Sequence, residues 1–154
     1  MLVFLPYIWI MKRNGDIIII EDDADDREIL AEVFGQVLAE NKYSNRLVIL
    51  EDSATVIDYL KESGTEPFLL LSDINMPKVD GFTLRNRIFN DPILKDRCVP
   101  YIFLTTSGSN RDYIQQAYTM SVQGYFCKPV KFEDYKNLIS EIMSYWKISK
   151  TPSW

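Results

Sequence analysis

The order of apolar runs along the chain limits its fold more than any other feature. Five short runs of β-branched or other apolar residues alternate with five longer segments that carry apolar residues at i, i+3 and i+4. The runs are predicted strands, at residues 17–20, 47–50, 68–71, 101–104 and 124–127. The segments are predicted helices, at residues 25–40, 54–61, 82–90, 111–120 and 133–146. Because such strands are buried on both faces, the alternation predicts an α/β fold, a doubly wound five-stranded parallel sheet with five helices.

The length of the chain fits one domain. Its 154 residues, 47% of them hydrophobic, suffice for a single core. We expect this domain over residues 14–148, between an apolar N-terminal extension, 1–13, and a C-terminal tail, 149–154. The tail leaves no room for an output domain, so a stand-alone module is expected.

The first eleven residues are almost entirely apolar. They are fewer than the roughly 20 residues that a membrane-spanning helix needs, and no positive region or small-residue cleavage site marks a signal peptide. Three interpretations stay open: an incidental extension before a natural start at Met11, a segment packed on the domain or a partner, and a membrane contact. None of them predicts a membrane span.

Charge and residue usage exclude several classes of function. A net charge of -5 with 25% charged residues argues against nucleic-acid binding. Cys98 and Cys127 lack the spacing of a zinc site or of a disulfide framework, which favours a reducing cytoplasm. The chain has no histidine. Any chemistry must therefore use carboxylates, hydroxyls, lysine and a hard metal ion.

Polar side chains stand where the predicted strands end. In a parallel sheet these ends share one edge, which is where open α/β sheets bind ligands. The chain places there Glu21-Asp22-Asp23, Ser72-Asp73, Thr105-Thr106 and Lys128-Pro129. We therefore expect these groups to converge.

Carboxylates gathered at one point repel each other unless a cation neutralises them. An all-oxygen ligand set that water and phosphate oxygens can complete favours Mg²⁺. The acidic run 22–26 lacks the glycine and the bidentate glutamate of an EF-hand, which argues against Ca²⁺. Asp25 and Asp26 are interpreted as solvated acids of a first helical turn.

The motif that begins at Asp73 gives the chain a specific resemblance. The stretch Asp73-Ile-Asn-Met-Pro-x-x-Asp-Gly81, with the preceding acidic pair, Thr105 and Lys128-Pro129, resembles the response-regulator receiver family over about residues 16–147. Within it the chain is similar to single-domain phytochrome-associated regulators. The resemblance implies the flavodoxin-like (CheY-like) strand order 2-1-3-4-5.

The resemblance also assigns the phosphoryl site. It makes Asp73 the phosphoacceptor, and it makes Asp22 a direct Mg²⁺ ligand, Glu21 a ligand through water and Asn75 a ligand through its backbone carbonyl. Asp73 completes the metal's oxygen set. Lys128 supplies an ammonium to the phosphoryl oxygens, and the peptide before Pro129 is expected to be cis.

Two residues of the resemblance form a switch. Thr105 matches the hydroxyl that binds the phosphoryl group, although counting back from Lys128 would select Thr106 instead. Tyr125 matches the aromatic residue that turns inward behind this hydroxyl. Asn75 and Ser107 match positions that tune phosphoryl loss.

The implied function is a phosphorylated signalling switch rather than an enzyme, with only self-catalysed phosphotransfer and autodephosphorylation. Its expected partners are a sensor histidine kinase or phosphotransfer protein, a downstream protein target, and a second copy bound through segments 111–120, 124–127 and 133–146. Tyr113, Tyr118 and Trp146 are candidate interface anchors or core residues.

Two alternative functions remain open from the sequence. One is a pseudo-receiver that binds partners without accepting phosphate. The other is a Mg²⁺-dependent phosphohydrolase with an aspartate nucleophile. The hydrolase is disfavoured because its usual general acid, two residues after the nucleophile, is replaced here by Asn75.

Overall fold

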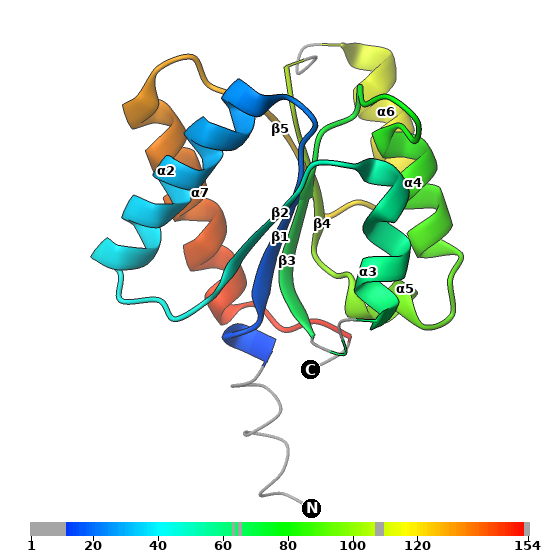
Figure 1. The fold of residues 1–154 in the computed structure, drawn as a ribbon, viewed down its shortest axis with the longest axis horizontal. Helices are drawn as coiled ribbons and strands as arrows, with labels where there is room; N and C mark the ends of the chain where they lie inside the picture. Colours follow the sequence, from blue (N-terminus) through cyan, green and yellow to red (C-terminus); the bar gives the residue numbers. More distant parts are fainter. Residues whose placement is uncertain (1–11, 63, 65, 107–109, 153–154) are drawn as a thin grey trace, which may run out of the picture.

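The computed structural model describes residues 12–62, 64, 66–106 and 110–152, and its centre is one parallel sheet (Figure 1). The five strands lie in the order β2-β1-β3-β4-β5. They are β1 (Asp16–Ile20), β2 (Leu47–Leu50), β3 (Pro67–Ser72), β4 (Tyr101–Thr105) and β5 (Gly124–Cys127). Every pairing between neighbours is parallel. The predicted strands and the order implied by the resemblance are confirmed.

The described residues form six α-helices and one short 3₁₀ helix. They are α2 (Ala24–Glu40), η1 (Ser53–Thr55), α3 (Val56–Glu62), α4 (Gly81–Phe89), α5 (Leu94–Arg97), α6 (Arg111–Thr119) and α7 (Phe132–Ile148). The five predicted helices are present. The prediction of five helices is one too few, because it lacks α5. A single turn is too short for a 3.6-residue period to show in the sequence.

Side-chain caps fix where several helices begin. The Asn110 side chain accepts the Tyr113 N–H at 3.2 Å, as its position before α6 predicts. Ser53, which stands just before the predicted helix 54–61, is predicted from the sequence to be its cap. This prediction is wrong, since the Asp52 carboxylate accepts the Ala54 N–H at 3.0 Å. The Ser53 hydroxyl instead donates to the carbonyl of Pro77, which joins this turn to the loop after β3.

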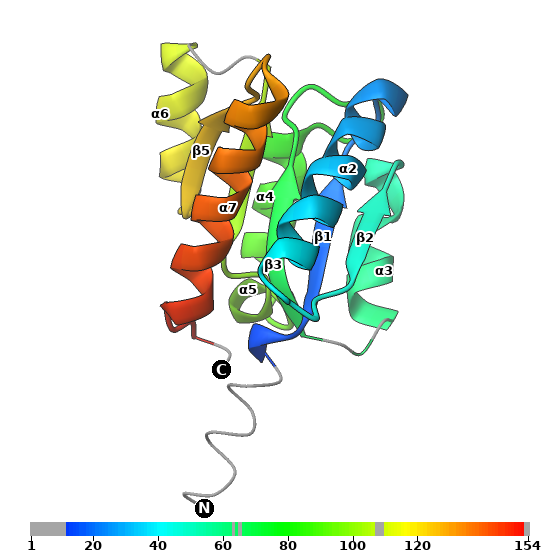
Figure 2. The same ribbon diagram turned by 90° about the vertical axis from the view of Figure 1, so that its left-hand side faces the viewer.

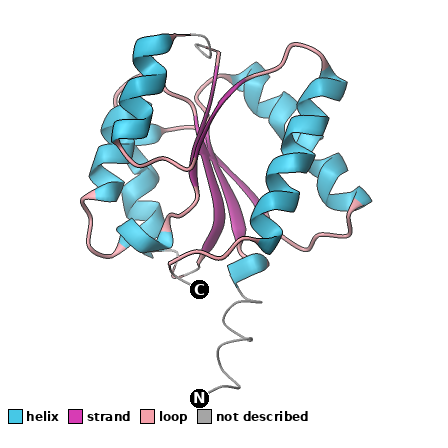
Figure 3. Ribbon diagram, turned by 180° about the vertical axis from the view of Figure 1, so that it is seen from behind, coloured by secondary structure: helices cyan, strands magenta, loops and turns pink. Residues whose placement is uncertain are grey.

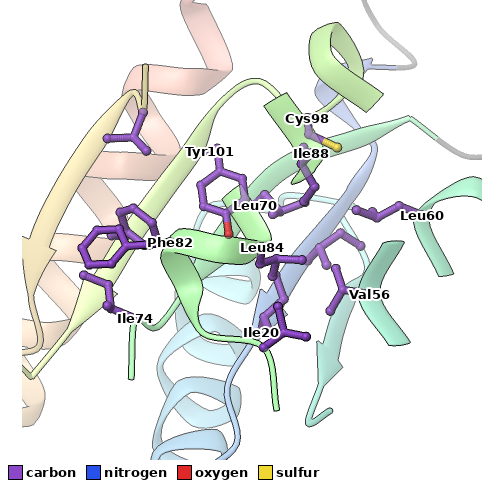
Figure 4. Packing of buried hydrophobic residues seen from close by; sticks show 14 of the residues in the cluster. Ile20, Val56, Leu60, Leu70, Ile74, Phe82, Leu84, Ile88, Cys98 and Tyr101 are labelled. Atoms are coloured by element: carbon purple, nitrogen blue, oxygen red, sulfur yellow. The ribbon is translucent and has the colours of Figure 1, made fainter. Parts of the chain in front are cut away.

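Helices cover both faces of the sheet (Figures 1 and 2). Helices α2 and α7 lie side by side on one face, and α3, α4, α5 and α6 lie on the other, as the view from behind also shows (Figure 3). Each strand therefore contributes alternate residues to two separate cores. On the α4 face, Leu70 and Tyr101 pack against Leu84 and Ile88 (Figure 4). This double coverage explains why the strands are apolar on both sides.

Two buried lysines fasten the chain at the edge where the strands begin. Lys12 is 4% exposed and donates to the carbonyls of Pro67 and Arg97. Lys147 of α7 donates to the carbonyl of Arg13 at 2.8 Å. Burial lowers the pKa of each amine to about 8.

The apolar segment 1–11 lies outside the described residues, so the three interpretations of it stay as predictions. Within the described residues, no helix has both the length and the apolar character that crossing a membrane requires.

Gly81, the first residue of α4, lies against the backbone of Asp73 and Ile74, just after β3. A Cβ placed there would lie 2.3 Å from the carbonyl oxygen of Asp73. Gly35 in α2 has open space around it. We expect Gly81→Ala to lower the free energy of unfolding by about 2 kcal/mol, because backbone must shift. Gly35→Ala should raise it by about 0.5–1 kcal/mol, since alanine favours a helix interior.

Urea unfolding of both variants measures this contrast. Equal effects of the two substitutions would contradict the tight approach of α4 to the end of β3.

Candidate functional site at the carboxyl edge of the sheet

Three carboxylates and one ammonium converge where the strands end, at the upper edge of the sheet in Figure 1. Glu21 and Asp22 follow β1, Asp73 follows β3, and Lys128 follows β5. Glu21, Asp22 and Asp73 each offer one oxygen, and these three oxygens lie within 4.8 Å of one another. The convergence predicted from the strand ends is therefore found for these four residues.

Lys128 binds a carboxylate with each of its three N–H donors. Its Nζ lies 2.7 Å from Glu21 Oε2, 2.9 Å from Asp26 Oδ2 and 3.1 Å from Asp73 Oδ2. Its side chain is 5% exposed, and those of Glu21 and Asp73 are 2% and 9% exposed. The ammonium thus offsets the mutual repulsion of these carboxylates, which burial would otherwise strengthen.

Burial and charge work against each other in this cluster. Burial raises the pKa of Glu21, the negative charge of Asp73 raises it further, and the hydrogen bond and charge of Lys128 lower it. For Lys128, burial lowers the pKa, but bonds to Glu21 and Asp26 and the charge of Asp73 outweigh it and raise the pKa above its ordinary value. Lys128 therefore stays an ammonium.

Backbone donors hold the carboxylates in place. Asp73 Oδ1 accepts the Ile74 N–H at 2.7 Å, and Glu21 Oε1 accepts the Asp23 N–H at 3.1 Å. The N–H of Gly81 donates to the carbonyl of Ile74 at 2.7 Å and closes the loop after β3. The Ile74 N–H therefore fixes one oxygen of the Asp73 carboxylate. The other oxygen, Oδ2, accepts a hydrogen bond from the Lys128 ammonium.

The donor set fits a hard divalent cation. Its three members are all carboxylate oxygens, and Asp22 is only partly buried. An open pocket beside Asp22 is lined by Arg27, Glu51, Asp52, Ser53, Pro77 and Lys78. Water could complete the coordination of an ion from this side, as Mg²⁺ requires.

The two threonines at the end of β4 occupy different environments. Thr105 is the last residue of the strand and is fully buried, whereas Thr106 is exposed. The carbonyl of Thr105 accepts the N–H of Lys128 at 2.9 Å, so it lies next to the site. Tyr125 is half-buried, and its ring meets the ring of Phe103 edge-on at 6.3 Å.

Asn75 and the loops around it depart from simple expectation. Asn75 is exposed, and its side-chain oxygen accepts the Tyr113 hydroxyl of α6 at 3.3 Å. Ser107 lies outside the described residues.

The expected cis peptide before Pro129 is wrong: among the described residues the cis bond is Val99–Pro100. Lys128 reaches the acids with its preceding strand in regular register.

The structure adds two residues that the sequence analysis did not place in the site. Asp26, interpreted as a solvated acid, contacts Lys128. Arg27 donates to the carbonyls of Glu21 and Asp22 at 3.2 and 2.6 Å and fixes the turn between β1 and α2. No pattern in the sequence identifies Arg27 as part of the site, because a cation in the first turns of a helix is common on protein surfaces.

The surface formed by α6, β5 and α7 carries exposed apolar side chains. Tyr118 is 54% exposed, Tyr145 is 60% exposed and Ile148 is 77% exposed. Of the other predicted anchors, Tyr113 and Trp146 are partly buried against the two cores. Tyr118 is thus the one predicted anchor that the structure leaves mostly exposed.

Comparisons with known proteins identify relatives that match most of the chain. The sequence model of the response regulator receiver domain matches residues 17–140. The chain is 33% identical over 142 residues to a probable methanogenesis regulatory protein, FilR2, of Methanothrix harundinacea, covering 86% of this chain and 90% of that protein. It is 30% identical over 135 residues to the response regulator Rcp1 of Synechocystis, covering 84% of this chain and 87% of Rcp1.

The solved structures that match include a phytochrome response regulator and a second response regulator. The phosphorylated cyanobacterial phytochrome response regulator RcpA matches with a TM-score of 0.77 and 27% identity, covering 90% of this chain and 98% of that one. The Mn²⁺-bound form of Rcp1 matches with a TM-score of 0.73 and 29% identity, covering 90% and 99%. With its sheet order and its edge of acids and lysine, this chain belongs to the response regulator receiver family.

Proposed function

We propose that this chain is a phosphoacceptor switch, in which Asp73 receives a phosphoryl group from a phosphohistidine on a sensor kinase or phosphotransfer protein. The observation that carries the proposal is the contact of Asp73 with the Lys128 ammonium inside a cluster of three carboxylates. A buried aspartate beside a fixed cation is prepared to receive a dianion.

The transfer is an in-line displacement at phosphorus. A carboxylate oxygen of Asp73 forms the new O–P bond, the P–N bond to the donor imidazole breaks, and the imidazole leaves with a proton from solvent. The Ile74 N–H keeps the Asp73 carboxyl group oriented, and Lys128 stabilises charge on the phosphoryl oxygens. Thr105 is the hydroxyl that binds the transferred group.

The residues that would hold Mg²⁺ are Asp22, Asp73, Glu21 and the backbone carbonyl of Asn75. When bound, Mg²⁺ neutralises the acids and the phosphoryl oxygens and so makes the approach of a phosphodonor favourable. The Mn²⁺-bound form of Rcp1 supports a divalent ion in this family, and the phosphorylated RcpA supports phosphoryl transfer.

The output is a change in protein–protein binding. Phosphorylation draws Thr105 toward the site, Tyr125 turns behind it, and the surface of α6, β5 and α7 shifts toward a state that binds a target or a second copy. The exposed Tyr118, Tyr145 and Ile148 are the apolar contacts that this surface offers.

The location we propose is the cytoplasm. Two free cysteines, Cys98 and Cys127, suit a protein of this reducing compartment.

Incubation with acetyl phosphate, with and without Mg²⁺, tests the function. We expect intact-protein mass spectrometry to show one added phosphoryl group with Mg²⁺ and essentially none after chelation. Sustained release of inorganic phosphate over many turnovers would indicate a phosphohydrolase instead. A protein that stays unmodified under both conditions would be a pseudo-receiver.

A further inference from the structure

Asp26 differs from the other two partners of Lys128. Glu21 and Asp73 belong to the group of carboxylates that can share a metal ion, whereas Asp26 does not. Its carboxylate is 31% exposed, against 2% for Glu21. Asp26 is therefore the one observed carboxylate partner of Lys128 that a metal ion at this site would not engage.

The start of α2 fixes Asp26 against the lysine. The Asp23 side chain caps the helix by accepting the Asp26 N–H at 2.9 Å. This places Asp26 in the first turn of a 17-residue helix, with its Oδ2 2.9 Å from Lys128 Nζ. Asp25, beside it in the same turn, is exposed, and no ion pair is found for it among the described residues.

An ammonium has three N–H donors, and here all three are in use. A phosphoryl group on Asp73 needs at least one of them. Metal binding to oxygens of Glu21 and Asp73 would leave the hydrogen bond to Asp26 in place. Donors that Glu21 and Asp73 release become open to the phosphoryl group, but the Asp26 carboxylate still competes with it for the position and charge of the same ammonium.

We propose that Asp26 is a positioning residue that holds Lys128 in the unmodified protein and competes with the phosphoryl group for it, which limits the stability of the phosphorylated form. The proposal rests on the phosphoacceptor function of Asp73. It assigns to α2 an influence on the phosphorylation level, separate from metal binding.

The test compares Asp26→Asn with Asp25→Asn in the full chain. The two substitutions remove the same charge from the same helical turn, and only the first removes a partner of Lys128. At a sub-saturating concentration of acetyl phosphate with Mg²⁺, we expect Asp26→Asn to raise the ratio of phosphorylated to unmodified protein roughly two- to fivefold, the scale of a partly exposed ion pair. Asp25→Asn should match the original protein, and Asp26→Glu should return the ratio toward it.

Two further measurements separate positioning from a general effect. The Mg²⁺ dissociation constant should be similar in both asparagine variants, because Asp26 lies outside the metal-binding group. The ¹⁵N resonance of the Lys128 ammonium in the unmodified protein should shift in Asp26→Asn alone.

Each possible result either supports or overturns the proposed competition between Asp26 and the phosphoryl group. An unchanged or lowered ratio in Asp26→Asn, or the same rise in Asp25→Asn, overturns the competition while leaving the phosphoacceptor function intact. If the original protein takes no phosphoryl group, the proposed function fails and this inference fails with it. If Asp26→Asn does not fold, a hydrogen-bond coupling between the Lys128 ammonium and the Asp26 carboxylate that disappears on phosphorylation supports the proposal, and one that persists refutes it.

Discussion

Replacing Asp73 with asparagine is expected to reduce labelling by acetyl phosphate at least about a hundredfold, because an amide is a poor nucleophile and forms no acyl phosphate. The fold should persist. The oxygen of asparagine can still accept the Ile74 N–H, and the loss of one negative charge relieves repulsion with Glu21. Mass spectrometry measures the labelling, and circular dichroism follows the fold.

Asp80→Asn is the matched control for this substitution. Asp80 lies in the loop after β3 and caps α4 by accepting the Thr83 N–H at 2.7 Å, which asparagine does equally well. We expect this variant to be labelled like the original protein. Labelling that persists in Asp73→Asn, or that is lost equally in Asp80→Asn, would contradict the assignment of the phosphoacceptor.

Replacing Lys128 with methionine should weaken both the fold and the chemistry. The change leaves Glu21, which is 1% exposed, without its cation, and removing one partner of a buried ion pair costs about 3 kcal/mol of unfolding free energy. Labelling should slow by on the order of 10²-fold, as when one preorganised donor to a developing charge is lost. Urea unfolding and the rate of phosphorylation measure the two effects.

The control for Lys128→Met is Lys136→Met. Lys136 also pairs with a carboxylate, Glu40, at 2.5 Å, but the Glu40 side chain is 57% exposed. A surface pair of this kind contributes at most about 1 kcal/mol. Added Mg²⁺ should restore part of the stability lost in Lys128→Met, because it neutralises the same acids. An equal loss of unfolding free energy in the two variants would contradict burial of the Lys128 cluster as the cause of the larger effect.

The strands could be predicted closely from the sequence because burial on both faces leaves an unbroken apolar run, which no solvated segment matches. The run 68–71, for example, lies within β3, in which every residue is buried. Helix α5 could not be predicted, since its four residues, Leu94–Arg97, complete barely one turn. The cap at Ser53 was wrong because Asp52, one residue earlier, competes for the same backbone donor.

The site was predictable to the extent that topology determines it. Parallel strands bring their ends to one edge whatever the loops do, so Glu21, Asp22, Asp73 and Lys128 could be placed together from sequence. Asp26 could not be distinguished from Asp25, because which acid of a helical turn faces the lysine depends on the direction in which α2 leaves the sheet. The same limit applies to the link between Tyr113 and Asn75, which depends on how α6 packs.

The most direct test of the phosphoryl site is chemical mapping of the modified residue. Borohydride reduces an aspartyl phosphate to homoserine, which peptide mass spectrometry locates in the sequence. After treatment with acetyl phosphate and Mg²⁺, we predict homoserine at position 73 alone, and none when Mg²⁺ is chelated. Homoserine at another aspartate, or modification of Asp73 that proceeds equally without a divalent cation, would contradict the account.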